Sequence, residues 1–440
     1  MRIPVVSLWL SALFLGACAQ TAPYRVSFEP CEIKVNVSDV TTAGSSAVAI
    51  EKVSCPTANR VRIRGNHPYE LAFVEIDEQG YLADRRQAEL AVEMAGAAPR
   101  NGGRVRVVVY VHGWHHNASA DDDNIARFHV TLAALSRWNP QDTVRGIYVG
   151  WRGDSLAIPG LRFLTFWDRK NTSDEVGRGS LYEVLMHLER AVKGGPSNSK
   201  NHLVLVGHSF GASVVFNSLG QLYMQRFIEG IYASAPGRRF RGYGDMVVLV
   251  NPAIEAMRYM PFHSALRYFA ERKTAPKADF SNELSPVLII LSSEGDWATR
   301  TTFPGARFFS TVLEAHRGAS ITGSAMDQGP HSEWVMDVQA LGNYQGFNTH
   351  EVIRLTSADR ANRLEKCSEL PEGALAKMIR ESAHSAQTFP DSEIVIRQKP
   401  GTPLNLPYWH ADLGTEIVKD HSQIKNLNLV CWVSQLIEAR

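Results

Sequence analysis

The segment from residues 203 to 220, LVLVGHSFGASVVFNSLG, constrains the fold more than any other stretch of the chain. Its aliphatic run ends at Gly207, and an apolar pattern with helical spacing begins directly after Ser209. A strand that turns at once into a helix forces strained backbone angles on the residue at the bend and crowds it on both sides. Gly207 and Gly211 lack the Cβ atoms that would collide there. We therefore expect a strand–elbow–helix unit with Ser209 at its tip.

The rest of the chain repeats this alternation of strand and helix. Continuous apolar runs, typical of strands buried on both faces, occur at 104–114, 144–153, 202–209, 245–253, 286–296 and 406–414. Helical spacing separates or follows them at 124–138, 175–192, 210–220, 253–272 and 428–439. Such alternation predicts an α/β fold with a mostly parallel central sheet flanked by helices.

Three segments divide the 440 residues. Residues 1–17 have the layout of a signal peptide, and residues 18–65 are expected to form a β-rich extension, because their pattern is short, alternating and rich in Val, Ile, Thr and Ser. Residues 66–440 are expected to form the main domain, with cap or insertion segments near 252–285 and 293–405.

The N-terminal segment also carries a targeting signal. Arg2 precedes an apolar stretch that is too short to span a membrane, and Leu15-Gly16-Ala17-Cys18 resembles the lipobox of bacterial lipoproteins. The resemblance implies a Cys18 that carries fatty acyl chains such as palmitate and anchors the chain to a membrane of the bacterial envelope. Ala19 favours the outer membrane, on its periplasmic side, if the cell is Gram-negative. The alternative is an ordinary cleaved signal with a chance cysteine.

The composition argues against a nucleic-acid partner and leaves the pairing of the cysteines undecided. The formal net charge is +1 and no basic run stands out, so we expect no nucleic-acid partner. Cys18 aside, four cysteines remain, and an oxidising envelope permits disulfides between them. We favour Cys31 with Cys55, since both lie in the N-terminal segment; the alternative is that some cysteines are simply small buried residues.

With this elbow, the chain resembles the α/β-hydrolase superfamily. Gly207-His208-Ser209-Phe210-Gly211 would be the nucleophile motif of that superfamily. The segments FVEIDEQG, VHGW and GWRG also look like an uncharacterised bacterial and fungal branch of predicted hydrolases. The resemblance implies an α/β-hydrolase fold and an oxyanion hole whose backbone N–H donors are each worth on the order of 3 kcal/mol. The donors would be Phe210 and, in the His-Gly-x turn, Trp114. A glycine turn without a catalytic part is the alternative for that turn.

In this family the acid and the base follow the serine in the order Ser, acid, His. Asp296 lies just past a buried strand and is our candidate acid, with Glu294 as the alternative. Asp296 could instead merely cap a helix that begins near Trp297. His421, ahead of the closing helix, is our candidate base. The weaker candidates are His331, His350, His384 and His410, the last because its ring is expected to pack within a strand.

These residues together predict a serine hydrolase that cleaves small-molecule or lipid acyl esters through an acyl-enzyme, without a cofactor. Two other readings compete. His112, His115 and His116 precede three aspartates, at 121–123, which suggests a metal site, but the spacing is not that of a helical zinc motif, so we expect no metal. The chain could also be a catalytically inactive envelope lipoprotein that serves as a binding or scaffold module.

Overall fold

The computed structural model describes residues 22–155, 165–195, 200–232, 240–274, 286–316, 332–354, 364–371, 386–403, 406–421 and 426–438, with a few single positions between them. The signal segment and Cys18, and likewise His331 and His384, lie outside the described residues. Among the helices that are described, none combines the length and the apolar character needed to cross a bilayer.

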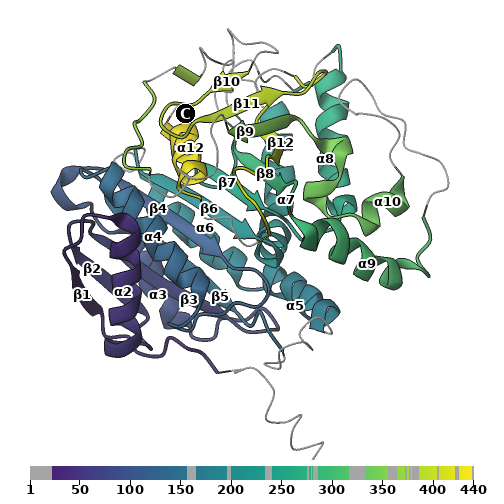
Figure 1. Ribbon diagram of the computed structural model, residues 1–440. Coiled ribbons are helices and arrows are strands. Elements are labelled where there is room, and N and C mark those ends of the chain that lie inside the picture. The colour runs from purple at the N-terminus through teal and green to yellow at the C-terminus, as the bar shows by residue number, and fades with distance from the viewer. Residues whose placement is uncertain are drawn as a thin grey trace, which may run out of the picture.

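Over the described residues, twelve strands form one sheet in the order β1-β2-β3-β5-β4-β6-β7-β8-β12-β9-β11-β10 (Figure 1). The central run from β3 to β9 is parallel throughout, and among the described strands the antiparallel pairs are β2 with β3, β9 with β11, and β11 with β10. The predicted α/β architecture with a mostly parallel sheet is therefore confirmed. The strands are β1 (Cys31–Val35), β2 (Arg60–Gly65), β3 (Tyr69–Ile76), β4 (Val105–Val111), β5 (Thr143–Trp151), β6 (His202–His208), β7 (Met246–Val250), β8 (Leu288–Ser293), β9 (His350–Arg354), β10 (Gln387–Thr388), β11 (Ile394–Gln398) and β12 (Tyr408–Leu413).

Helices cover both faces of this sheet, and each face has its own hydrophobic core. The first core joins the sheet to α3 (Arg85–Gly96), α5 (Phe166–Arg178), α6 (Leu181–Lys193), α7 (Phe210–Tyr232) and α8 (Ala256–Glu271). The second joins it to α2 (Val40–Ser54), α4 (Asp123–Trp138) and α12 (Leu427–Glu438). Because strands covered on both faces bury nearly every side chain, the sequence shows them as continuous apolar runs rather than as alternation.

The expectation of a β-rich N-terminal segment is wrong for residues 40–54. These residues form α2. At the N-cap of this helix, the Asp39 side chain accepts a hydrogen bond from the Thr42 N–H at 2.8 Å. The buried positions of α2 follow helical spacing: Val40, Ala43, Gly44, Ala47, Val48 and Glu51. Ala43, Gly44 and Ala47 in this stripe let α2 pack closely on α4. A Cβ added at Gly44 would lie only 2.6 Å from the Val130 side chain of α4. The strands on either side, β1 and β2, do extend the central sheet.

Part of the insertion expected at 293–405 belongs to the sheet. Strands β9, β10 and β11 continue it beyond β12, so these residues extend the core and do not stand apart from it. The same region supplies α9 (Phe303–Thr311) and α10 (Glu333–Val338), preceded by the π-helical turn η4 (Ala298–Thr302). The other expected insertion contains α8, which continues through Pro261.

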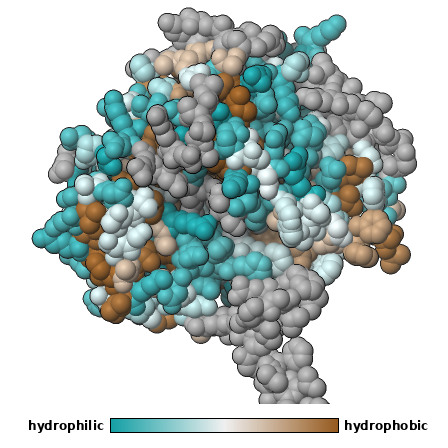
Figure 2. Space-filling model, in the orientation of Figure 1, coloured by the Kyte–Doolittle hydropathy of each residue, from teal (hydrophilic) through white to brown (hydrophobic). Residues whose placement is uncertain are grey.

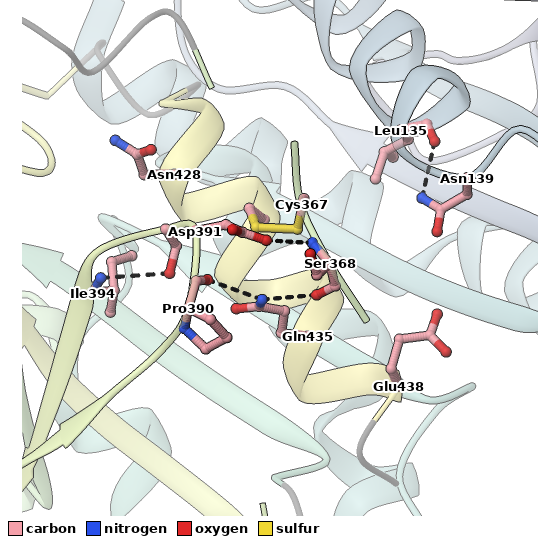
Figure 3. The surroundings of a disulfide bond; sticks show 12 residues. Leu135, Asn139, Cys367, Ser368, Pro390, Asp391, Ile394, Asn428, Gln435 and Glu438 are labelled. Carbon is pink, nitrogen blue, oxygen red and sulfur yellow. Dashed lines mark hydrogen bonds between the residues drawn. A yellow bond between two sulfur atoms is a disulfide. The ribbon is translucent and has the colours of Figure 1, made fainter. Parts of the chain in front are cut away.

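Two disulfides join distant parts of the chain. Cys31 is bonded to Cys55, and Cys367 is bonded to Cys431 across 64 residues. The second bond fastens α12 to the segment that precedes β10, as Figure 3 shows. Beside it, the Gln435 side-chain amide donates to the carbonyl oxygens of Ser368 and Pro390 at 2.9 and 3.0 Å. This cluster fixes the closing helix, which directly follows the loop that carries His421.

Removing the Cys367–Cys431 bond should lower the free energy of unfolding more than removing the Cys31–Cys55 bond. A disulfide restricts the unfolded chain, and the effect grows with the length of the closed loop: about 4 kcal/mol for 64 residues and about 3.5 kcal/mol for 24 on the chain-entropy account. Urea unfolding of the Cys367→Ser/Cys431→Ser and Cys31→Ser/Cys55→Ser variants measures both. A larger loss for the N-terminal pair would contradict this order.

Two buried histidines in the sheet should make the protein less stable in mild acid. Burial lowers the pKa of His350 to about 3 and that of His410 to about 4, whereas an unfolded histidine has a pKa of about 6.5. The folded state therefore binds fewer protons than the unfolded state below about pH 6.5. The free energy of unfolding should fall by up to about 1.4 kcal/mol per pH unit for each histidine as the pH drops from about 6.5 toward 4. Urea midpoints at pH 7.5 and 5 check this, and His350→Gln should flatten the dependence.

Candidate functional site

Three side chains far apart in the sequence meet at the carboxyl ends of the parallel strands. Ser209 follows β6, Asp296 follows β8, and His421 lies between β12 and α12. The imidazole Nε2 of His421 lies 2.8 Å from the Ser209 hydroxyl oxygen, and its Nδ1 lies 2.9 Å from the Asp296 carboxylate. Both distances are those of hydrogen bonds. The structure thus brings the candidate nucleophile, base and acid into one continuous chain of hydrogen bonds.

The elbow has the crowding that the glycines suggested. Ser209 has a φ of +57°, a conformation that non-glycine residues rarely adopt. Its N–H donates to the Val250 carbonyl at 3.0 Å, and its carbonyl accepts from the Ala253 N–H at 3.2 Å. A Cβ at Gly211 would lie 2.2 Å from the Val111 carbonyl oxygen, and one at Gly207 would lie 2.8 Å from Ala212 Cα. Both glycine positions therefore exclude any side chain, and the neighbouring strands hold Ser209 in its strained conformation.

Asp296 is fully buried among hydrogen-bond donors. The Thr299 N–H donates to one carboxylate oxygen at 3.1 Å, and the Thr299 hydroxyl donates to the other. That hydroxyl in turn accepts from the Asn343 amide at 2.8 Å. Because its neighbours donate, both Asp296 carboxylate oxygens act as hydrogen-bond acceptors, and one of them faces His421. The bond from Thr299 N–H also means that Asp296 caps the turn that follows it, so the structural role considered for it coexists with the contact to His421.

Glu294, the alternative acid, points elsewhere. Its side chain is exposed, and its backbone carbonyl accepts from Arg300 at 2.8 Å. The carboxylate within hydrogen-bonding distance of His421 is that of Asp296.

Two side chains hold the loop that carries His421 by contacting the backbone carbonyl oxygen of His421. The His208 Nε2 lies 2.8 Å from this oxygen, and the Asn251 side-chain amide donates to it at 3.4 Å. Asn251 also accepts from the Ser293 N–H at 2.9 Å, so it joins the ends of β7 and β8 to the His421 loop. Sequence reasoning missed Asn251, Thr299 and Asn343, since each acts through a partner distant in the chain.

The expected oxyanion donors border the elbow. Phe210 is the first residue of α7, where backbone N–H groups have no partner within the helix. Gly113 lies against Ser209, because a Cβ at Gly113 would be 2.8 Å from Ser209 Cβ and 2.9 Å from the His208 carbonyl oxygen. The Trp114 ring packs 5.8 Å from that of Phe210, centroid to centroid. The segment 113–114 therefore packs directly against Ser209 and the start of α7.

Gly113→Ala should lower activity strongly without unfolding the protein. The added methyl group would collide with Ser209 and the His208 carbonyl, which cannot move without displacing the elbow. Gly305→Ala is a matched control, because a Cβ there meets no atom within 4 Å. Ester turnover and circular dichroism of both variants measure the effect. Equal activity of the Gly113 variant and wild type would separate this turn from the site.

The histidines that suggested a metal site are each engaged separately. His112 is fully buried, with Nδ1 2.9 Å from the Gly113 carbonyl oxygen and Nε2 accepting from the Trp151 N–H at 2.9 Å. Burial lowers its pKa to about 4, so the ring is neutral and donates from Nδ1. His115 contacts Asp154 at 2.6 Å, and His116 contacts Asp122 at 3.1 Å. These contacts orient the loop after β4.

Within the described ranges, the side chains close enough together to share a metal ion are Glu314, His316 and Asp337. Arg307 already places a guanidinium 2.9 Å from the Asp337 carboxylate, which disfavours a metal cation there. His350 and His410, the weaker candidates for the base, are buried in β9 and β12, away from Ser209 in the hydrogen-bond pattern.

Comparison with known proteins does not assign the chain to a family. No protein-family model matches it, and no curated protein matches it at a significant level. The case for its chemistry therefore rests on the geometry described above.

Proposed function

We propose that this protein is a serine hydrolase of the α/β-hydrolase type that cleaves acyl esters. The observation that carries the proposal is the chain of hydrogen bonds from Ser209 through His421 to Asp296, at 2.8 and 2.9 Å. The order of the three residues in the sequence, serine, acid, histidine, is the order of that superfamily. The positive φ of Ser209 and the glycines on both sides also support it.

In the proposed reaction, the Ser209 oxygen attacks the ester carbonyl carbon while His421 Nε2 takes the hydroxyl proton. The backbone N–H groups of Phe210 and Trp114 would stabilise the negative oxygen of the tetrahedral intermediate. His421 then gives its proton to the leaving alcohol as the ester C–O bond breaks, which leaves an acyl group on Ser209. Water, deprotonated by His421, hydrolyses this acyl-enzyme and restores the serine. Asp296 holds the imidazole in the required tautomer and stabilises its charged form.

We retain the lipid anchor at Cys18 as part of the proposal, and with it a location at the bacterial envelope. In this proposal the described part of the chain, which contains the candidate site, lies on one face of the membrane that holds the anchor.

Turnover of p-nitrophenyl esters of graded chain length tests the proposed activity. We expect release of p-nitrophenol that is unchanged by a chelator, since no step requires a metal ion. Loss of turnover in the chelator would favour metal-assisted hydrolysis. No turnover of any ester would favour the alternative in which the protein binds or scaffolds without catalysis.

A further inference from the structure

Large apolar side chains are exposed at the end of α9. Phe309 is 73% exposed and Leu313 is 95% exposed, and Phe308 and Val312 are exposed beside them. Phe308 and Phe309 lie in the last turn of α9, and Val312 and Leu313 follow the helix directly. Phe308 also packs on the exposed ring of Trp334. We call these five residues the α9 cluster. Figure 2 shows hydrophobic side chains gathered there, at the right-hand edge of the molecule.

The body of the protein holds α9 in place, and the start of this helix lies near the candidate site, since Phe166 packs on both Phe303 and Phe210. Only the turn η4 and Trp297 separate α9 from Asp296, and Trp297 is itself 64% exposed. The Trp167 indole N–H of α5 donates to the Ala306 carbonyl of α9 at 3.2 Å. An apolar surface that is both fixed and exposed indicates a binding partner, because scattered exposed residues do not gather in this way.

The N-terminal end of the described chain is fixed at the same edge of the sheet. The backbone N–H groups of Tyr24 and Arg25 donate to the Glu75 carboxylate near the end of β3, at 2.9 and 2.8 Å. The Arg25 side chain is fully buried, where it bonds to Glu51 at 2.6 Å and to the Ala118 carbonyl at 2.7 Å. Cys18 precedes Tyr24 by six residues, so a lipid attached there would lie within about 20 Å of this point.

Ser209 lies between these two places. Along the carboxyl edge the strand order is β3-β5-β4-β6-β7-β8, so the elbow after β6 is three strands from the entry of the chain and two from β8. At a spacing of about 4.8 Å per strand, the entry point and the segment leading to α9 are roughly 24 Å apart. The entry of the chain near Tyr24 and the segment that leads to the α9 cluster thus lie on either side of the candidate nucleophile along this edge.

We propose that the carboxyl edge of the sheet faces a lipid bilayer, which the α9 cluster enters, and that the ester substrate is taken from that bilayer. The substrate class rests on the proposed hydrolase function and on the anchor at Cys18, whereas the docking of α9 does not require hydrolysis. Phe, Leu and Trp are the residues that enter the boundary between headgroups and acyl chains. Because the five residues of the α9 cluster are all uncharged, we expect the contact to depend on apolar burial and not on anionic lipid.

Comparing a bilayer substrate with a soluble one tests the proposal. The full chain is reconstituted in phosphatidylcholine vesicles as wild type and as Phe309→Ser/Leu313→Ser. The double variant should hydrolyse a vesicle-embedded ester at least tenfold more slowly, with turnover of soluble p-nitrophenyl acetate unchanged and little effect of salt on either rate. Tyr232→Ser is the matched control: this exposed ring ends α7, which starts at Phe210 directly after Ser209 and runs back toward the opposite edge of the sheet. Equal vesicle rates, or equal losses on both substrates, would overturn the proposal.

A second readout does not depend on catalysis. On vesicles, backbone amides of residues 303–313 should exchange hydrogen several-fold more slowly in wild type than in the double variant, while in detergent the two should exchange alike. Equal exchange on vesicles would overturn the docking even if the esterase activity is found. Protection without any ester turnover would support the docking and refute the proposed function. A detergent-solubilised dimer that the double variant dissociates would assign the cluster to a second copy of the chain instead.

Discussion

Replacing Ser209 with alanine should lower kcat for p-nitrophenyl ester hydrolysis by about a millionfold, to the residual rate that binding and oxyanion donors alone provide. The variant removes the hydroxyl that His421 Nε2 contacts at 2.8 Å and leaves no oxygen to form the acyl-enzyme. Alanine is smaller than serine and occupies the same backbone conformation, so the fold should remain. Steady-state kinetics with the purified variant measure the loss.

Ser218→Ala is the matched control for this prediction. Ser218 lies on α7, the helix that begins directly after Ser209, and is also buried, but its hydroxyl donates to the Gly177 carbonyl at 2.7 Å, away from His421. Its removal should leave kcat within a few-fold of wild type. Turnover by the Ser209 variant near the wild-type rate would mean that another group is the nucleophile.

Asp296→Asn should lower kcat by about ten-thousandfold. An amide in place of the carboxylate can turn its NH2 group toward His421, which then cannot keep the tautomer that accepts the Ser209 proton. It also cannot stabilise the imidazolium that forms. The Thr299 donors that surround Asp296 would meet a group that itself donates, so part of the loss would come from a rearranged turn.

Glu294→Gln distinguishes the two acids considered from the sequence. Glu294 is exposed two residues before Asp296, so neutralising it should change kcat less than threefold. Kinetics of both variants, with circular dichroism to check the fold, give the comparison. A large loss at Glu294 with little loss at Asp296 would reverse the assignment of the acid.

Local pattern was sufficient to predict the centre of the fold. The strand–elbow–helix unit at 203–220 could be identified because an aliphatic run, two crowded glycines and a helical pattern adjoin one another there. The central strands β4 to β8 could be identified as continuous apolar runs because both of their faces are covered. Parallel strands align their carboxyl ends, which is why Ser209, Asp296 and His421 meet although each follows a different strand.

Features set by distant contacts were harder to predict. Helix α2 was missed because half of its buried stripe, Ala43, Gly44 and Ala47, is small, and its Ser and Thr residues resemble those of a β segment. Strands β9 and β11 were hidden in a long stretch without clear periodicity, and long-range pairing is what defines them, since β9 pairs with β12 and β11 pairs with β9. The bond between Cys367 and Cys431 joins residues too far apart for spacing to reveal it.

The same limit applies to the surroundings of the site. Asn251 and Asn343 stand in ordinary loop sequences, and only the folded chain brings them to the His421 carbonyl and to Thr299. His421 was favoured because it precedes the closing helix, whereas the buried His350 and His410 could not be separated from it by residue type.

The most direct measurement is to locate the adduct formed with a fluorophosphonate, a reagent that reacts with an activated serine. We expect one equivalent of adduct per chain, mapped by peptide mass spectrometry to Ser209, with no adduct on the His421→Ala variant under the same conditions. An unmodified chain, or an adduct on a residue other than Ser209, would contradict the account.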